Sequence, residues 1–248
     1  MNLPFKRMAW CFNLGLHTAS DDIPPDILAR FDVEIQEHQV GKHTFRMLAV
    51  RNPDTLLEAV TPAEFVVDER LPYWAELWTS SIALAAHCLE QTGLNGKRVL
   101  DLGCGLGLTG ISAARGGASV VFADYEEDAL RFARANARIN LGAADVARCE
   151  FRLVDWRELG ALEAFDVVLG ADIIYERCHF APLLQSLHAT VGHGGEAWLA
   201  EPDRVLGSDF FAFARADGWS VDIREKSVDR RGRTSRVRIA VIRNGVRP

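Results

Sequence analysis

The chain has 248 residues, 48% of them hydrophobic, and carries a formal net charge of -6 at pH 7. This length suits one α/β domain with a short extension, and the apolar content is sufficient for a full hydrophobic core. The negative charge argues against a protein that mainly coats nucleic acid or an anionic membrane, so we expect neither as a partner.

The first part of the chain predicts a β-hairpin ahead of the main domain. Residues 31–36 and 44–50 both alternate apolar and polar side chains, and Gly41 lies between them. Asp54 follows a strand-breaking Asn-Pro pair and can cap a short helix. We therefore expect an N-terminal extension over residues 1–70 and a main domain over residues 71–248.

From residue 97 onward, predicted strands alternate with predicted helices over short connections. This order is typical of a parallel sheet covered by helices on both faces. The expected strands are 99–102, 119–123, 151–154, 165–170, 196–200, 219–226 and 236–243, and the expected helices are 82–89, 109–115, 126–140, 182–191 and 210–216. The predicted fold class is α/β, with a Rossmann-like seven-stranded sheet that ends in an antiparallel hairpin.

Basic residues outnumber acids between Arg224 and Arg247. Several arginines stand close together around the expected turn at Gly232, namely Arg230, Arg231, Arg233, Arg236 and Arg238. We interpret this segment as a solvated hairpin whose arginines alternate outward, in preference to a dedicated anion or RNA site.

The glycine-rich stretch 99–110 predicts a buried strand that turns tightly into a helix. Gly103 and Gly105 let a ligand approach bare backbone, and the N–H groups of the following helix favour its electron-rich edge. A dinucleotide fingerprint that starts at Gly103 would need its third glycine where Leu108 stands, which disfavours NAD. The spacing Asp101-x-Gly103-x-Gly105-x-Gly107 resembles motif I of the class I methyltransferases that use S-adenosylmethionine.

An acid and an aromatic residue follow the next two predicted strands. Asp124 stands about twenty residues past the glycines, where a carboxylate accepts hydrogen bonds from ribose hydroxyls. Together with Asp101 and the glycines it predicts a nucleoside cofactor. Trp156 fits either an indole beside the adenine or an ordinary core tryptophan, and spacing does not separate the two.

Asp172 and Tyr175 follow the fourth predicted strand, where α/β sheets present side chains to their ligand crevice. A carboxylate and a phenol three residues apart can hold an amine. Taken alone, Asp172 can also be a helix cap.

Together with Trp78, these residues resemble the small seven-strand protein lysine methyltransferases, including those that modify chaperones and the β subunit of electron-transfer flavoprotein. The resemblance covers about residues 71–187. It implies cofactor contacts for Trp78, Asp101, Gly103, Cys104, Gly105, Asp124, Tyr125, Trp156 and Ala171, and an acceptor site at Asp172 and Tyr175. The segment 199–204 is also similar to a post-strand motif of the flavoprotein-modifying branch, although Glu201 replaces its usual aspartate.

The resemblance implies in-line transfer of a methyl group from S-adenosylmethionine to the uncharged amine of a lysine on a protein substrate, which leaves S-adenosylhomocysteine. A nearby carboxylate stabilises the ammonium form of an amine, so we expect Asp172 to orient the acceptor rather than to act alone as its base. Two alternatives stay open: methylation of a small-molecule amine, and a cofactor-binding interaction module without catalysis.

Cysteines and histidines point to no further chemistry. The cysteines stand at wide, unrelated spacings, which predicts neither a zinc site nor a disulfide framework: Cys11, Cys88, Cys104, Cys149 and Cys178. The histidines show no metal-ligand spacing, so no metal is expected. Residues 1–20 lack the apolar core of an export signal, and the cysteine pattern fits a reducing cytoplasm.

Overall fold

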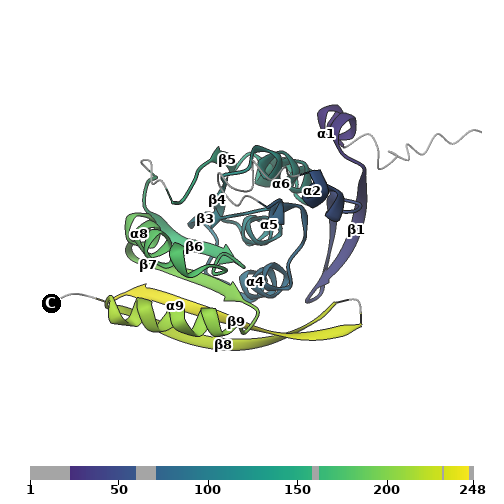
Figure 1. Cartoon of the computed structure of the whole chain (residues 1–248). Coiled ribbons are helices and arrows are strands. Elements are labelled where there is room, and N and C mark those ends of the chain that lie inside the picture. The colour runs from purple at the N-terminus through teal and green to yellow at the C-terminus, as the bar shows by residue number, and fades with distance from the viewer. Residues whose placement is uncertain (1–22, 60–70, 158–161, 231, 246–248) are drawn as a thin grey trace, which may run out of the picture.

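The structure is a computed structural model that describes residues 23–59, 71–157, 162–230 and 232–245 (Figure 1). The expectations for residues 1–20, for Cys11 and for Arg231 therefore lie outside the described residues. Within the described part of the chain, no helix is long and apolar enough to cross a membrane.

A seven-stranded sheet forms the centre of the molecule, in the order β5-β4-β3-β6-β7-β9-β8. Its first five strands in this order run parallel, β9 is antiparallel to β7, and β8 is antiparallel to β9. The strands are β3 (Arg98–Leu102), β4 (Ser119–Asp124), β5 (Cys149–Leu153), β6 (Phe165–Ala171), β7 (Val191–Glu201), β8 (Trp219–Arg230) and β9 (Arg233–Asn244). The predicted α/β sheet with its antiparallel C-terminal hairpin is confirmed.

Helices cover both faces of the sheet (Figure 1). Side chains alternate between the faces along each strand, so Val99 and Leu100 belong to different cores. One core includes α4 (Thr79–Glu90), α5 (Leu108–Arg115) and α6 (Glu127–Asn140), and the other includes α8 (Phe180–Thr190) and α9 (Val205–Ala216). Short helical segments complete the order: α1 (Pro25–Arg30), α2 (Asp54–Ala59), η1 (Tyr73–Ala75), α7 (Ala143–Val146) and η2 (Arg177–His179).

The predicted first hairpin is also confirmed. Strands β1 (Val33–Val40) and β2 (His43–Val50) pair antiparallel as a separate two-stranded sheet. Asn136 of α6 binds this hairpin through both atoms of its amide: Oδ1 accepts from Leu48 N at 2.6 Å and Nδ2 donates to Leu48 O at 3.1 Å. The hairpin shares its apolar core with the main sheet, and the division of the chain at residue 70 stays a prediction.

The C-terminal hairpin is longer than predicted. Strand β8 continues through Arg230 and β9 begins at Arg233, so the expected strand ends at 226 and 236 were wrong. The polar residues between them resemble a loop in sequence. They form strands because only one face of this part packs against the protein, and the solvent-facing positions accept charged side chains.

Candidate functional site

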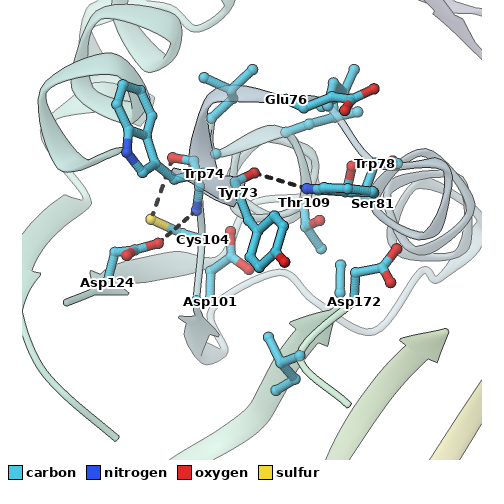
Figure 2. Close-up of a pocket in the computed structure, with 18 of the residues that line it drawn as sticks. Tyr73, Trp74, Glu76, Trp78, Ser81, Asp101, Cys104, Thr109, Asp124 and Asp172 are labelled. Carbon is cyan, nitrogen blue, oxygen red and sulfur yellow. Dashed lines mark hydrogen bonds between the residues drawn. The ribbon is translucent and has the colours of Figure 1, made fainter. Parts of the chain in front are cut away.

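One cavity lies at the carboxyl ends of β3, β4 and β6, where parallel sheets present their ligand sites (Figure 2). Every site residue predicted from the sequence lines it: Trp78, Asp101, Gly103, Cys104, Gly105, Asp124, Tyr125, Trp156, Ala171, Asp172 and Tyr175. The structure thus brings together residues that lie nearly a hundred positions apart in the chain.

The glycine turn after β3 forms one wall of the cavity. Gly103 has a φ of +66° and Gly105 a φ of +51°, a region that favours glycine. A Cβ atom on Gly103 would lie 2.9 Å from Cγ2 of Ile173, so a side chain at this position would also meet the wall opposite. The turn therefore exposes backbone to the cavity, as a closely bound ligand requires.

Two buried carboxylates hold this turn in place. Asp101 Oδ2 accepts a hydrogen bond from Gly110 N at 2.8 Å and so fixes the first turn of α5. Asp124 Oδ2 accepts from Gly105 N at 2.9 Å, and its Oδ1 accepts from Glu126 N at 3.0 Å. Burial raises the pKa of Asp101 to about 7 and that of Asp124 to about 6, although these backbone hydrogen bonds act in the opposite direction.

Aromatic side chains from distant segments border the same cavity. The Trp78 indole donates from Nε1 to Tyr73 O at 2.8 Å (Figure 2). Trp156 is buried, and its ring meets the His179 ring edge-on with centroids 5.4 Å apart. Trp156 therefore both lines the cavity and packs in the core, which combines the two alternatives left by the sequence.

These features fit a nucleoside cofactor. The bare backbone at Gly103 and Gly105 allows close approach. A carboxylate has more acceptor sites than Asp124 uses for its bonds with backbone N–H groups, so it can also accept from ribose hydroxyls. The indoles offer flat apolar surfaces for a base.

Asp172 occupies an unusual backbone position immediately after β6. Its φ is +59°, and its N–H donates to Ala200 O of the neighbouring strand at 2.8 Å. The side chain is only 8% exposed, and its Oδ1 lies 3.3 Å from Nη1 of Arg204. Burial raises the pKa of Asp172, while the nearby Ser80 hydroxyl and the Arg204 guanidinium act in the opposite direction.

Tyr175 lies on the same side of the cavity. Its ring centroid is 6.1 Å from that of Tyr73 and 5.2 Å from that of His179. Burial raises the pKa of Tyr175 to about 12, so the side chain is a neutral phenol at physiological pH. It can donate one hydrogen bond and accept others.

Sequence reasoning missed Tyr73 and the role of Arg204. Tyr73 lines the cavity, and Arg204 reaches Asp172 from the segment after β7. In the sequence, residues 199–204 stand out only as a motif. Because β6 and β7 pair in parallel, with Ala171 opposite Ala200, the segments that follow the two strands lie side by side. Knowing this pairing would have placed Arg204 near Asp172.

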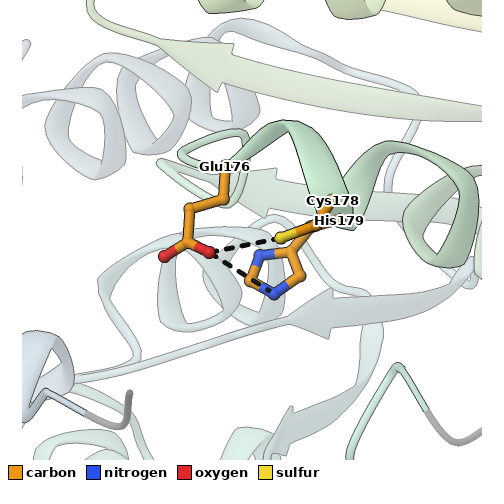
Figure 3. Close-up of side chains that lie close together, drawn as sticks. All are labelled: Glu176, Cys178 and His179. Carbon is orange, nitrogen blue, oxygen red and sulfur yellow. Dashed lines mark hydrogen bonds and ion pairs between the residues drawn. The ribbon is translucent and has the colours of Figure 1, made fainter. Parts of the chain in front are cut away.

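Among the described residues, the Cys104 thiol is a candidate nucleophile and one group of side chains is a candidate metal site. Burial raises the pKa of the Cys104 thiol well above its usual range, which disfavours a thiolate. Glu176, Cys178 and His179 gather near the cavity, with Cys178 Sγ 3.3 Å from Glu176 Oε2 (Figure 3). However, a metal-bound histidine normally donates from its other ring nitrogen, and His179 Nδ1 is buried without a hydrogen-bond partner. We therefore assign His179 to packing against Trp156 and Tyr175.

Comparison with known proteins places this site in a family. Residues 73–212 match the model of a family described as lysine methyltransferase. The chain is 32% identical over 137 residues to a histidine protein methyltransferase 1 homolog of Dictyostelium discoideum, covering 53% of this chain and 44% of that protein. It is 37% identical over 123 residues to the protein N-lysine methyltransferase METTL21A of Danio rerio, covering 48% and 56% respectively. The matches span about half the length of these relatives.

Solved structures agree with the fold. The magnesium protoporphyrin IX methyltransferase of Synechocystis, solved with bound S-adenosylmethionine, superposes with a TM-score of 0.53 at 22% identity. The match covers 73% of this chain and 84% of that one. The family match and the fold confirm the resemblance found in the sequence.

Proposed function

This chain belongs to the lysine methyltransferase family, and we propose that it methylates the side-chain nitrogen of a lysine on another protein. The observation that carries this proposal is the position of Asp172. Its carboxylate is buried and lines the cavity that also contains Tyr175 and the glycine turn. A lysine amine that enters this cavity meets an acceptor of hydrogen bonds beside the cofactor pocket.

We assign the cofactor to the side of the cavity formed by the turns after β3 and β4. Gly103 and Gly105 provide bare backbone there, and Asp124 accepts from hydroxyl groups. Trp78 and Trp156 border the base. When bound, S-adenosylmethionine supplies a methyl group on a sulfonium, which is a good leaving group, so the chain mainly has to align the acceptor.

Asp172 and Tyr175 position the acceptor amine. Asp172 accepts a hydrogen bond from the nitrogen, and the neutral Tyr175 phenol shapes the pocket around it. An isolated carboxylate would stabilise the unreactive ammonium form. Arg204 offsets that effect because its guanidinium compensates the charge of Asp172. The ion pair thus keeps an acceptor of hydrogen bonds in place at a lower cost to deprotonation of the amine.

The cytoplasm is the compartment that we propose. Three of the described cysteines are free thiols, which fits a reducing environment: Cys88, Cys104 and Cys149. A protein substrate is the expected partner.

The test is transfer of a labelled methyl group from S-adenosylmethionine to a lysate of the host cell, followed by gel separation and amino-acid analysis of the labelled bands. Methyl-lysine in a discrete protein band supports the proposal. Asp172→Asn is the matched negative control, because asparagine accepts the same backbone conformation.

Other outcomes identify other acceptors. Methyl-histidine in the band would place this chain with its histidine-modifying relatives and overturn the choice of lysine. Label found only in small solutes would show that the methyl acceptor is a small-molecule amine. Binding of the cofactor without any methyl transfer would show that the chain is an interaction module without catalysis.

A further inference from the structure

We propose that the free end of the β8–β9 hairpin binds an acidic segment of the protein substrate, next to the residue that is methylated. This inference rests on the proposed function and names the substrate class more closely. The surface consists of residues 226–230 and 233–237, which we call the basic ribbon.

The basic ribbon concentrates positive charge in an acidic protein. Its ten residues include Lys226, Arg230, Arg233 and Arg236 but only one acid, Asp229, which gives a net charge of +3. Lys226 is paired with Glu90 of α4 at 2.6 Å, so the ligand-facing charge comes mainly from the arginines. Since the whole chain carries -6, the rest of it carries -9. Such segregation of charge favours an anionic partner at this place and opposes it elsewhere.

The basic ribbon is a built part of the fold. Strand β9 pairs with β7 only from Arg238 to Arg243, so the ribbon extends beyond the sheet. Val228 and Val237 are buried in the core that includes α4, which anchors the ribbon on that helix. In Figure 1 the yellow hairpin runs on past α9 and lies below α4.

Each strand of the ribbon contacts a segment that borders the cavity. Arg230 Nη1 lies 3.5 Å from Oε1 of Glu76, and Glu76 lines the cavity between Trp74 and Trp78. On the other side, Arg236 Nη1 lies 3.8 Å from Asp203 Oδ2. Asp203 immediately precedes Arg204, the residue paired with Asp172. A chain segment that delivers a lysine to Asp172 therefore passes near the ribbon.

The arrangement of the arginines leaves positive charge available for a ligand. Arg230 and Arg233 stand directly opposite each other in the strand register, where like charges are destabilising. Glu76 lies beside Arg230, while Arg233 is exposed. Arg236 is 62% exposed and lies 3.8 Å from each of its acidic neighbours, a distance that gives weak surface pairing. Carboxylates of a substrate would relieve the repulsion.

An acidic peptide fits this surface better than a nucleic acid. The ribbon is short and is joined to a domain with a strong negative charge, so a long polyanion would be repelled beyond its few contacts. A short run of aspartate and glutamate next to a lysine needs only these contacts. Arginine binds such carboxylates with directed, charge-assisted hydrogen bonds.

The experiment compares fluorescent peptides that carry one central lysine flanked by acidic residues, or by the matching amides. Binding is measured by anisotropy on the full chain saturated with S-adenosylhomocysteine, at low and at physiological salt. We expect the acidic peptide to bind at least about tenfold more tightly at low salt, with the difference shrinking as salt rises. The double substitution Arg233→Glu and Arg236→Glu should abolish the difference.

Arg138→Glu is the matched control, because Arg138 is an exposed arginine on α6, outside the ribbon. Its effect on peptide binding should be small, and all variants should keep the affinity for S-adenosylhomocysteine. Equal binding of both peptides, or equal loss in Arg138→Glu, would overturn the proposal. If a single-stranded oligonucleotide binds more tightly than the acidic peptide, the ligand of the ribbon is a nucleic acid and the proposal is wrong.

Failure of this inference is distinguishable from failure of the proposed function. If the acidic peptide binds through the ribbon but no label is transferred to any protein lysine, the docking surface is supported and lysine methylation is contradicted. If the ribbon variant transfers label to a lysate protein as well as the unsubstituted protein does, the proposed activity is supported and the docking surface is contradicted.

Discussion

The guanidinium of Arg204 lies 3.3 Å from the carboxylate of Asp172, and a buried ion pair fixes the backbone that carries it. Arg204 N donates to Glu201 Oε2 at 2.8 Å, and Arg238 Nη2 donates to Arg204 O at 2.7 Å. Glu201 and Arg238 also bind each other directly. The acceptor end of the cavity is thus supported by β7 and β9 as well as by β6.

Asp172→Asn should lower methyl transfer at least about a hundredfold, because an uncharged amide orients the amine less strongly than a carboxylate does. The affinity for S-adenosylmethionine should change less than about threefold, since the assigned cofactor contacts lie elsewhere. Calorimetric titration with the cofactor and labelled transfer to the lysate acceptor measure the two quantities. A parallel loss of affinity would contradict the assigned role.

Arg204→Gln should move the acidic limb of the pH–rate profile to higher pH. Without the guanidinium, the Asp172 carboxylate stabilises the ammonium form of the acceptor, so a higher pH is needed to release its proton. Initial rates of labelled transfer between pH 6 and about 10 measure the shift. Arg204→Lys should restore most of the profile, whereas a purely structural role would lower the rate equally at every pH.

Gly103→Ala should weaken binding of S-adenosylmethionine by about tenfold or more, equivalent to about 1.4 kcal/mol. The new Cβ would lie 2.9 Å from Ile173 and would require a φ of +66°. Gly41→Ala is the matched control, because Gly41 has a φ of +59° but no atom within 4 Å of the added carbon. It should cost about 1–2 kcal/mol of stability and leave cofactor affinity unchanged. Equal affinities of the two variants would remove the assigned contact at Gly103.

Arg238→Met should lower the free energy of unfolding by about 3–5 kcal/mol, because it leaves the buried Glu201 without its cation. Arg243→Met provides a control on the same strand. Arg243 pairs with Glu196 at 2.6 Å but is 51% exposed, so its loss should cost less than about 1 kcal/mol. Urea denaturation of both variants gives the comparison, and similar costs would show that burial of the pair is unimportant.

Asp101→Asn should change how stability depends on pH. Burial raises the pKa of Asp101 to about 7, from 3.8, so the folded protein binds more protons than the unfolded chain between these values. The carboxylate therefore lowers the free energy of unfolding as the pH rises from about 4 to about 7. Asparagine can accept the hydrogen bond from Gly110 without titrating.

Unfolding in urea without cofactor, measured across this pH range, tests the expectation. The stability of Asp101→Asn relative to the unsubstituted protein should increase toward pH 7. A constant difference between the two proteins would mean that Asp101 does not titrate there.

Local patterns were sufficient to predict much of the fold. Residues 99–102 are apolar up to Asp101 and run into glycines, and the structure has β3 followed by a turn with positive φ angles at those glycines. The prediction failed where polarity and strand formation conflict. Residues 227–230 resemble a loop but continue β8, because pairing with β9 satisfies their backbone while Ser227 and Asp229 face solvent and Val228 packs into the core.

The sequence by itself determined the strand, turn and helix around the cofactor, because glycine conformation and hydrophobic periodicity act over a few residues. It also placed an acid and a phenol three residues apart after β6. Only the tertiary structure decided what surrounds that acid. Arg204 reaches Asp172 because β7 pairs beside β6, and the basic ribbon reaches Glu76 because β8 and β9 extend past the sheet onto α4. Both contacts depend on the order of strands, which local preferences do not fix.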